Sequence, residues 1–413
     1  MTASYQLGDL NVEQFNIASS RGLIDLSQSF VSMSIYESIF TPGSICDIIV
    51  LDTKDLLGTL KLSGDEIVNM TISVTGSVTA SYVFALHKLS DLQMTSGQQR
   101  GKQYKLMCVS EEAMYAKTNY VQKSYNMLCS DMIQDIHKNY LTSQKDINVE
   151  DTQSPQNIIV PHKNPYEAVN LIRKRAVSQK YKSSSYVYFE NRPKELQQFN
   201  FVTIESLFDQ VITKDFIQSS TINTDFFNRT DNNIIAYTIP KQFSSTEKIS
   251  LGGPRKITTY DFTTQQFLTN TIKTNETNYL SGGINLPDTS LTFQNRYYNS
   301  PIPPQSLIPV DISQRATTHI DEAAPNLQAY IAKISQNAMK VKVIGDTVLT
   351  AGIMVSCAIP NKTGTTGPSD LDPLLSGNFL VSRIHHKVGL FQEKPRYTCI
   401  MELLKGGYEE GIY

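Results

Sequence analysis

Apolar and polar residues alternate along two similar stretches that lie roughly 300 residues apart in the chain. The early stretch reads Tyr82-Val-Phe-Ala-Leu-His-Lys-Leu89 and, past a polar turn, Tyr104-Lys-Leu-Met-Cys-Val-Ser110. The late stretch reads Phe379-Leu-Val-Ser-Arg-Ile-His-His-Lys-Val388 and then Tyr397-Thr-Cys-Ile-Met-Glu-Leu403. Alternation with a period of two predicts strands with one buried face. The shared layout, with a His-Lys pair and a second strand that opens on Tyr, predicts a duplicated β-domain.

The residues upstream of the two hairpins strengthen this prediction. Gly64 precedes the alternating run that ends at Val74, and Gly352 precedes the run that ends at Ile359. Glycine at such a position supplies a backbone φ that other residues resist. The alternative is that glycine, strand, turn and strand occur together in many unrelated β-proteins.

The flanking segments predict a barrel around each hairpin. Residues 1–112 read as short strands, with Val31, Met33 and Ile35 alternating with serines and a turn at Thr41-Pro-Gly-Ser44. Strands at such regular spacing indicate a first tube-like antiparallel barrel. Residues 339–413 begin with Met339-Lys-Val-Lys-Val-Ile344 and predict a second tube-like barrel, in which residues 362–373 form a long loop.

Between the barrels, residues 113–212 predict a small α+β domain. Ser124 is the expected N-cap of a helix whose apolar face carries Cys129, Met132, Ile133, Ile136 and Tyr140. Asn164-Pro165 predicts the start of a second helix, which runs through Ala176. The runs Ser185–Glu190 and Phe199–Ile204 predict a hairpin rich in aromatic residues.

Residues 213–338 are rich in Asn, Thr, Gln and Ser. Residues 213–245 are expected to hold strands that complete the second barrel, and residues 246–338 a polar accessory domain. Leu327, Tyr330, Ile331, Ile334 and Ala338 recur at helical spacing and predict that this domain ends in a helix. The predicted fold is therefore mainly β, with an α+β middle domain, two homologous antiparallel barrels and smaller accessory domains.

Composition narrows the classes of function. The chain has 413 residues, a charged fraction of 18% and a net charge of −2, which gives no overall bias toward polyanions. The five cysteines are scattered without a CxxC pair, so reduced core thiols are expected rather than a metal site or a disulfide framework. Neither a signal peptide nor an apolar run long enough for a membrane span is predicted.

No catalytic motif is found, so we expect no enzyme activity and no catalytic, metal or cofactor residues. Gly97–Gln103 has glycines too close together for a phosphate loop and is predicted to be the tip of a hairpin. His385 and His386 point to opposite faces of a strand, so we expect one in a core and one at a surface or interface. His87 is read in the same way, and His137 as a surface residue of a helix that also carries Asp131 and Asp135. Glu111-Glu112 and Glu409-Glu410 are splayed neighbours and make no glycosidase pair.

In their order along the chain, four segments resemble the baseplate hub proteins of contractile-tailed phages, the family related to the hub part of type VI secretion spikes. These segments are Ser34–Ser38 with Gly64–Ile67, then Asn164–Ala176 with Tyr186–Glu190 and Phe199–Phe201, then the helix at 326–338 leading into Val341, and finally Gly377–Lys387 with its closing strand. The resemblance is weak between residues 213 and 325.

The resemblance implies a trimer in which two barrels per chain form a pseudo-hexameric ring. Such a ring would join the hexameric tail tube to a three-fold central spike, because two homologous domains per chain resolve the symmetry mismatch. It implies as partners the tail tube protein and the central spike protein, with the tape measure and baseplate wedge proteins as further candidates, and DNA only passing through the lumen. The implied location is the tail baseplate of a virion assembled in the host bacterial cytoplasm.

Two other interpretations stay open. A hub of this kind could belong to a secretion or bacteriocin particle, because both use the same ring. The chain could instead be a glycan-binding or glycan-cleaving β-protein of a phage tail, which would need exposed aromatics and carboxylates in one groove. The absence of Trp, a favoured sugar-stacking residue, weighs against the glycan interpretation.

Overall fold

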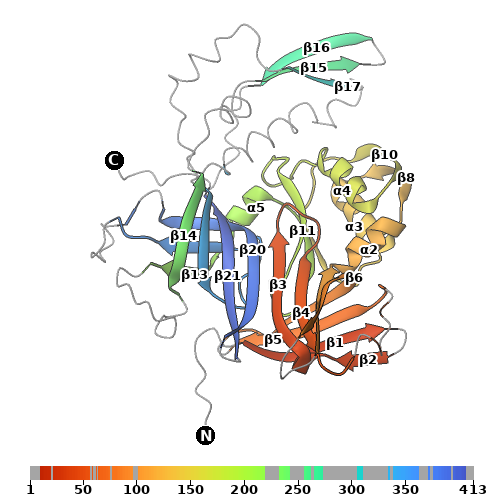
Figure 1. Cartoon of the computed structure of the whole chain (residues 1–413). Coiled ribbons are helices and arrows are strands. Elements are labelled where there is room, and N and C mark those ends of the chain that lie inside the picture. Colours follow the sequence, from red (N-terminus) through yellow and green to blue (C-terminus); the bar gives the residue numbers. More distant parts are fainter. Residues whose placement is uncertain are drawn as a thin grey trace.

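The computed structural model describes residues 10–19, 22–55, 58, 62, 64–74, 77–95, 101–218, 232–241, 255–261, 265–272, 305–309, 334, 338–361, 371–372, 375–391 and 394–405. Over these residues the fold is mainly β, as the alternating pattern predicts. A large sheet runs through two barrels, and a small α+β domain packs beside them (Figure 1). Its strands are β1 (Leu10–Ser19), β2 (Gly22–Asp25), β3 (Phe30–Ser38), β4 (Ile45–Asp52), β5 (Ile67–Val74), β6 (Ala80–Thr95), β7 (Gly101–Val109), β13 (Ile212–Ile217), β14 (Ile234–Lys241), β18 (Ala338–Ile344), β19 (Met354–Ala358), β20 (Gly377–Phe391) and β21 (Lys394–Leu404).

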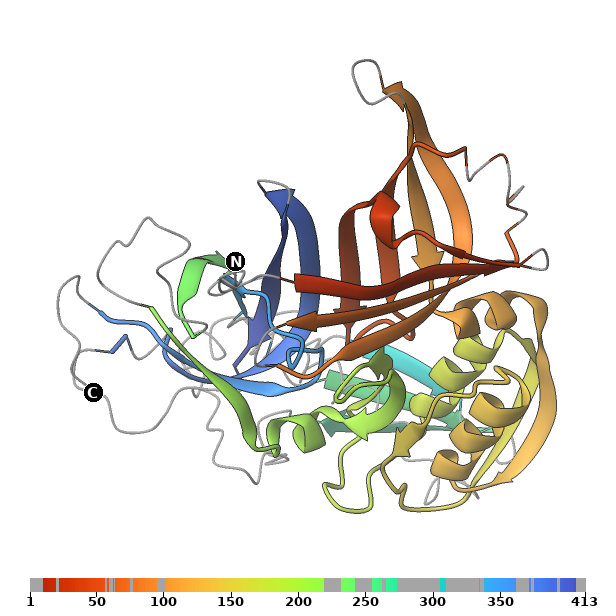
Figure 2. The ribbon, with the colours of Figure 1, turned by 90° about the horizontal axis from the view of Figure 1, so that it is seen from below.

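The strand order of the large sheet contains the same arrangement twice. Along its path the order is β14-β18-β21-β20-β3-β4-β7-β6-β5-β1-β2, while β19 pairs with β20 and with β13. The neighbours β4-β7-β6-β5 therefore correspond to β18-β21-β20-β19, each being a hairpin flanked by the two strands that precede it in sequence. All of these pairs are antiparallel. Figure 2 shows the two barrels side by side, the first in red and orange and the second in blue.

One irregularity is shared by the two repeats, whereas a second shift in β6, between Ser90 and Gln93, has no counterpart in β20. The pairing of β6 with β7 shifts register between Leu86 and Lys88, and that of β20 with β21 shifts between Val381 and Arg383. Bulges are usually retained among related strands, so a bulge at the same position of both hairpins supports their equivalence. The two predicted glycines match as well, since φ is +99° at Gly64 and +87° at Gly352. The prediction of a duplicated β-domain is thus confirmed.

The register corrects one detail of the sequence comparison. His87 lies at the bulge and corresponds to Ser382, whereas His386 lies further along its strand. Tyr104 corresponds to Cys399 and not to Tyr397. The two His-Lys pairs are therefore not equivalent, because a bulge moves every later residue by one place and a short motif cannot reveal the shift.

Among the described residues, one antiparallel strand pair joins the two barrels. The first half of β20 pairs with β19, and its second half pairs with β3 of the first barrel, from Arg383 opposite Ser38 to Gly389 opposite Ser32. We call this β3·β20 pair the seam. One pairing departs from the predicted antiparallel pattern, because β13 runs parallel to β19.

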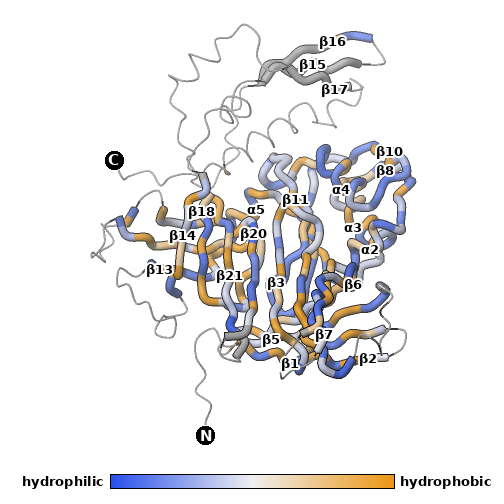
Figure 3. The backbone as a smooth tube through the Cα atoms, viewed as in Figure 1, coloured by the Kyte–Doolittle hydropathy of each residue, from blue (hydrophilic) through white to orange (hydrophobic). Residues whose placement is uncertain are grey.

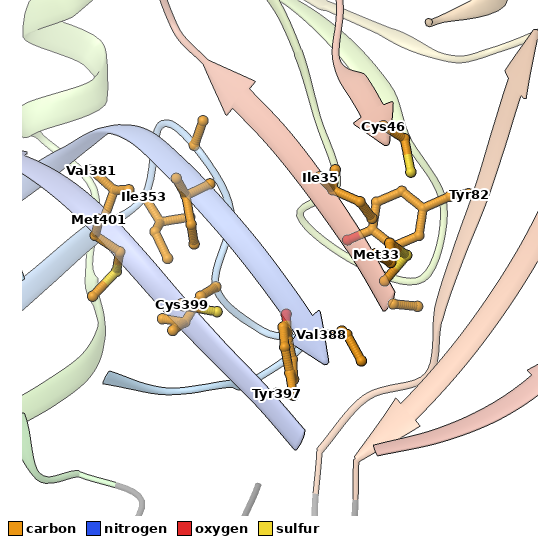
Figure 4. Close-up of a cluster of buried hydrophobic side chains, with 14 of the residues drawn as sticks. Met33, Ile35, Cys46, Tyr82, Ile353, Val381, Val388, Tyr397, Cys399 and Met401 are labelled. Carbon is orange, nitrogen blue, oxygen red and sulfur yellow. The ribbon is translucent and has the colours of Figure 1, made fainter. Parts of the chain in front are cut away.

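One hydrophobic core extends through both barrels across the seam. Apolar residues alternate along the strands, as the hydropathy colours show (Figure 3). Met33 and Ile35 of β3 and Val388 of β20 are each almost fully buried in this core (Figure 4). All five cysteines are buried and free, which confirms the expectation of reduced core thiols. Burial raises the pKa of every one of these thiols.

The middle domain has its own core. Its elements are α2 (Glu111–Thr118), β8 (Val121–Met127), α3 (Cys129–Asn139), β9 (Ile147–Val149), β10 (Gln156–Lys163), α4 (Pro165–Arg173), β11 (Tyr186–Asn191), β12 (Gln198–Thr203) and α5 (Ile204–Phe208). The Asn164 side chain accepts a hydrogen bond from the Tyr166 backbone N–H, 2.9 Å away, so the predicted N-cap is confirmed. The predicted aromatic hairpin is β11·β12.

Two predictions of helix ends in this domain are wrong. Ser124 lies inside β8 and caps no helix, because α3 begins only after Leu128. The second helix ends at Arg173, before Ala176. In each case the buried apolar face was identified correctly, while the end was decided by pairing and packing with other elements.

Residues 213–338 are described only in part. Strands β13 and β14 pair with β19 and β18 of the second barrel. A separate small sheet contains β15 (Arg255–Asp261), β16 (Gln266–Ile272) and β17 (Gln305–Pro309) in the order β16-β15-β17. Of the predicted terminal helix, Ile334 is helical and buried, and Ala338 already begins β18. The remaining residues of that helix lie outside the described residues, as do Gly97, Glu409, Glu410 and most of the 362–373 loop.

Candidate assembly surface

Where the two barrels and the middle domain meet, polar side chains form a buried group that we call the central polar cluster: Glu37, Tyr82, Arg192, Thr350, His386 and Tyr397. Arg192 follows β11, and its Nε donates to the Tyr82 hydroxyl at 2.9 Å. Its guanidinium also donates to the backbone oxygens of Lys194 and Thr347. Arg192 thereby ties the middle domain to β6 of the first barrel and to the loop after β18 of the second.

Glu37 and His386 lie on the core side of the seam within this cluster. Glu37 accepts hydrogen bonds from the Thr350 hydroxyl at 2.5 Å and the Ala351 backbone N–H at 3.0 Å. His386 Nδ1 lies 2.6 Å from the Tyr397 hydroxyl, and its Nε2 lies 3.8 Å from Glu37. Burial raises the pKa of Glu37, and burial with the nearby Arg192 charge lowers the pKa of His386 to about 3. The imidazole is therefore neutral at pH 7, and its contact with Glu37 is not an ion pair there.

A second buried group fixes the middle domain to the first barrel. Lys145 Nζ lies 2.9 Å from Glu112 and 2.5 Å from Glu190, both of which are almost fully buried. Glu190 also accepts from the Ser44 backbone N–H at 2.9 Å and from its hydroxyl at 2.6 Å, in the turn before β4. Burial alone would raise the pKa of Glu112, but the ion pair and hydrogen bonds with Lys145 outweigh it and hold that pKa below its usual value. These contacts orient the domain without forming an accessible site.

The adjacent histidines divide between core and interface, as predicted. His386 is fully buried, and His385 stacks on Tyr36 across the seam with ring centroids 4.3 Å apart. His87 is exposed at the bulge of β6. The prediction for His137 is wrong, because its side chain is buried and lies near the Tyr188 hydroxyl at 3.3 Å and the Lys145 carbonyl at 3.0 Å. Burial lowers its pKa.

The other polar residues considered as candidate chemistry have structural partners. Asp135 accepts hydrogen bonds from Lys123 and from the Tyr125 hydroxyl, at 2.9 Å and 2.7 Å. Glu111 accepts from Tyr115 on the surface of α2, while Glu112 turns into the Lys145 group. Among the residues that the structure describes, no three His, Cys, Asp or Glu side chains come together in a way that could hold a metal ion. That the chain has no catalytic or cofactor residues stays a prediction.

The large sheet has open strand edges in the described part of the chain, among them those of β6 and β14. Strand β6 pairs with β5 only up to Ala85, so the outer edge of its second half, from Lys88 to Thr95, has no strand beside it there. Leu92 and Met94 on this half are 54% and 76% exposed. Strand β14 ends the sheet, and its only strand partner within the described ranges is β18. Open edges of this kind are templates for pairing with another chain.

Comparison with solved structures identifies the fold. A tail protein from Neisseria meningitidis MC58 matches with a TM-score of 0.56 at 10% identity, over 96% of this chain and 96% of that one. The 43 kDa tail protein of prophage MuSo2 from Shewanella oneidensis matches with a TM-score of 0.52 at 9% identity, over 95% and 98% of the two chains. The chain has the fold of these tail proteins. No protein-family model matches the sequence, and no curated protein matches it.

A weaker structural match is to an E. coli component of the type VI secretion system, described as structurally similar to the T4 tail proteins gp27 and gp5. It matches at 8% identity with a TM-score of 0.45, over 96% of this chain and 76% of that one, which is too low to assign a fold. No helix in the described residues is long and apolar enough to cross a membrane.

Sequence reasoning missed most of the central polar cluster. Glu37 did carry a signal, because it continues the apolar series of Met33 and Ile35 and so occupies a core position in β3. A charged residue in the apolar phase of a strand is expected to have a buried partner. Arg192, beside the turn at Pro193, carried no such signal, because its partners in the two barrels come from segments more than 100 residues away.

Proposed function

We propose that this chain is a structural baseplate hub protein of a phage tail. In this proposal three copies form a ring in which six barrels surround a conduit, with the tail tube protein on one side and the central spike protein on the other. The chain would act by assembly rather than by catalysis. Its tail-protein fold supports the proposal at the level of architecture.

The observation that carries the proposal is the repeated strand order within one chain. The segments β4-β7-β6-β5 and β18-β21-β20-β19 form two equivalent units joined side by side at the seam. A ring of three such chains presents six equivalent units to a hexameric tube while it keeps three-fold symmetry for a spike. The buried Arg192 and Lys145 groups support this role, because they hold the two barrels and the middle domain in one fixed arrangement.

No observation favours the glycan interpretation. The exposed aromatic side chains of the described residues lie on separate elements: Tyr36 on β3, Tyr115 on α2, Tyr120 after α2 and Phe267 on β16. Tyr36 is occupied by its stack on His385, and Tyr120 by a stack on His162 with centroids 4.5 Å apart. A sugar platform needs such rings together with carboxylates in one groove.

The native mass of the purified chain, measured by light scattering behind a sizing column, tests the proposal. We expect a mass about three times the 46.3 kDa of one chain, and rings with six lobes in negative stain. The same preparation should not hydrolyse peptidoglycan or polysaccharide. A stable dimer, or any such hydrolysis, would overturn the proposal.

A further inference from the structure

The two repeats differ in what covers one edge of their long hairpin strand. In the second barrel, β20 pairs with β19 along its first half and with β3 along its second half. In the first barrel, β6 pairs with β5 along its first half, and its second half has no such neighbour in the described part of the chain. The second half of β6 thus has the position that β3 covers in the other repeat.

The exposure of equivalent residues follows this difference. The hairpin registers place Met94 of β6 at the position of Val388 of β20. Val388 is fully buried, whereas Met94 is 76% exposed. Leu92, also on the open half of β6, is 54% exposed. An apolar surface that is covered in one repeat and exposed in the other indicates a missing neighbour rather than a solvent-adapted edge.

In the seam the neighbour of β20 is β3, so the neighbour that β6 lacks should be the strand equivalent to β3, which is β14 of the second barrel. In the first barrel, β3 lies outside β4, and in the second barrel, β14 lies outside β18. Both pairings shift register at the same place, between Phe30 and Ser32 in β3 and between Ile234 and Ala236 in β14. Ser34 and Thr238 are therefore equivalent. The far edge of β14 is open within the described residues, as the far edge of β3 would be without β20.

We propose that β14 of one copy pairs antiparallel with the second half of β6 in a neighbouring copy, and so repeats the seam between chains. The occupant is a second copy of this chain. In the seam Lys387 faces Ser34, so Gln93 should face Thr238 of the neighbour, and Thr95 should face Ala236. Each copy offers one β14 edge and one β6 edge, which makes the contact head-to-tail, and such contacts close into rings when the rotation permits. The inference rests on the proposed trimeric hub for the number of copies at which the ring closes.

Cysteine cross-linking tests the register directly. Gln93 and Thr238 are both exposed, so we expect the double variant Gln93→Cys with Thr238→Cys to fold and to form disulfides between copies on mild oxidation. Facing residues of an antiparallel pair lie close enough for such a bond. The native thiols are buried, so few disulfides between copies should form through them. Each single variant is a control, and Gln93→Cys with Ile159→Cys is the matched control, because Ile159 is 74% exposed on β10.

The expected result on a non-reducing gel is a series that ends at three linked chains, given only by the Gln93/Thr238 pair. A trimer in light scattering without these cross-links would overturn the strand pairing and leave the proposed hub intact. Cross-links that continue beyond three chains would keep the strand pairing and overturn the trimeric ring. If the experiment finds no trimer and no cross-links, both the strand pairing and the proposed hub are overturned.

A charge on the open edge gives a second test that needs no disulfide. Met94→Asp should raise the dissociation constant of the assembly by at least about tenfold, because the charge would be buried against β14 of the neighbour. Circular dichroism of the isolated chain should not change, since Met94 is exposed in one copy. An unchanged assembly with this variant would contradict the inference.

Discussion

Tyr36 of β3 stacks on His385 of β20 across the seam, with ring planes 17° apart. The two residues face each other in the strand register, and they lie on the face of the sheet opposite the shared core. On the same face, ion pairs join the flanking strands, between Lys105 of β7 and Asp47 of β4 at 2.8 Å and between Arg383 of β20 and Glu402 of β21 at 3.4 Å. The seam therefore has contacts on both faces of the sheet, which suits a junction that holds two barrels in a fixed relationship.

The ring stack should contribute a modest part of the stability of this junction. Tyr36→Ala is expected to lower the free energy of unfolding by about 0.5–1.5 kcal/mol, the range measured for ring pairs. Tyr36→Phe is the matched control, because it keeps the ring and should leave stability almost unchanged. Urea denaturation measures both. Equal losses in the two variants would show that the hydroxyl, and not the stack, matters.

Removing the positive charge of Lys145 should lower the free energy of unfolding far more than removing the ring stack does. Lys145→Met leaves Glu112 and Glu190 buried without a positive partner and should destabilise the protein by about 3–5 kcal/mol at pH 7. Lys163→Met is the control, because its ion pair with Glu167 is exposed and long, at 3.7 Å. Denaturation curves of both variants give the comparison.

Lowering the pH should reduce the loss of stability that the Lys145→Met variant shows relative to the wild-type protein. In the wild-type protein the pKa of Glu112 lies below its usual value, so its contribution to stability is present above that usual value and is lost as the pH falls through the lowered one. Without Lys145, burial dominates and protonation begins at higher pH. The difference between the two proteins should therefore shrink from pH 7 to pH 4.5. A constant difference would contradict the electrostatic explanation.

His386 should make stability fall on mild acidification. Its folded pKa of about 3 lies below the usual value, so between these values the unfolded state binds the proton and the folded state does not. Its contribution is thus fully present above pH 6.5 and declines below it, by at most about 1.4 kcal/mol per pH unit. Between pH 6.5 and pH 5, the free energy of unfolding of the His386→Asn variant should therefore fall by up to about 2 kcal/mol less than that of the wild-type protein.

Other titratable groups define the controls for this experiment. The pKa of His137 is also lowered by burial, so part of the acid sensitivity should remain in the His386→Asn variant. Glu37 faces the imidazole and has a raised pKa, which acts in the opposite direction. Glu37→Gln should therefore keep the histidine slope. If it removes the slope as His386→Asn does, the titrating group is not the imidazole.

Ending the chain at residue 376 should give insoluble protein. The truncation removes β20 and β21, and with them the strand partners of β3, β18 and β19. Newly open edges promote association between chains. The soluble yield of the truncated and full-length chains, expressed side by side, checks this expectation. A soluble and cooperatively folding truncation would show that the second barrel does not depend on its hairpin.

The sequence by itself determined the secondary-structure elements of this protein and which of their faces are buried. Alternation along residues 82–110 and 379–403 determined two hairpins, and the helical periodicities after residue 128 and at Asn164 determined two helices of the middle domain. Such patterns are readable because burial of one face imposes a period on neighbouring residues. The core position of Glu37 and the opposite orientations of His385 and His386 follow from the same period.

Only the tertiary structure decided how these units meet. The seam pairs residues 32–38 with 383–389, and Arg192 bonds to Tyr82 and Thr347, across separations that no local pattern records. The bulge positions that make Met94 equivalent to Val388 are likewise hidden, because a one-residue shift changes the pairing without changing the composition. Local periodicity therefore identifies which face of a strand is buried, whereas the partner on its edge depends on where the rest of the chain folds.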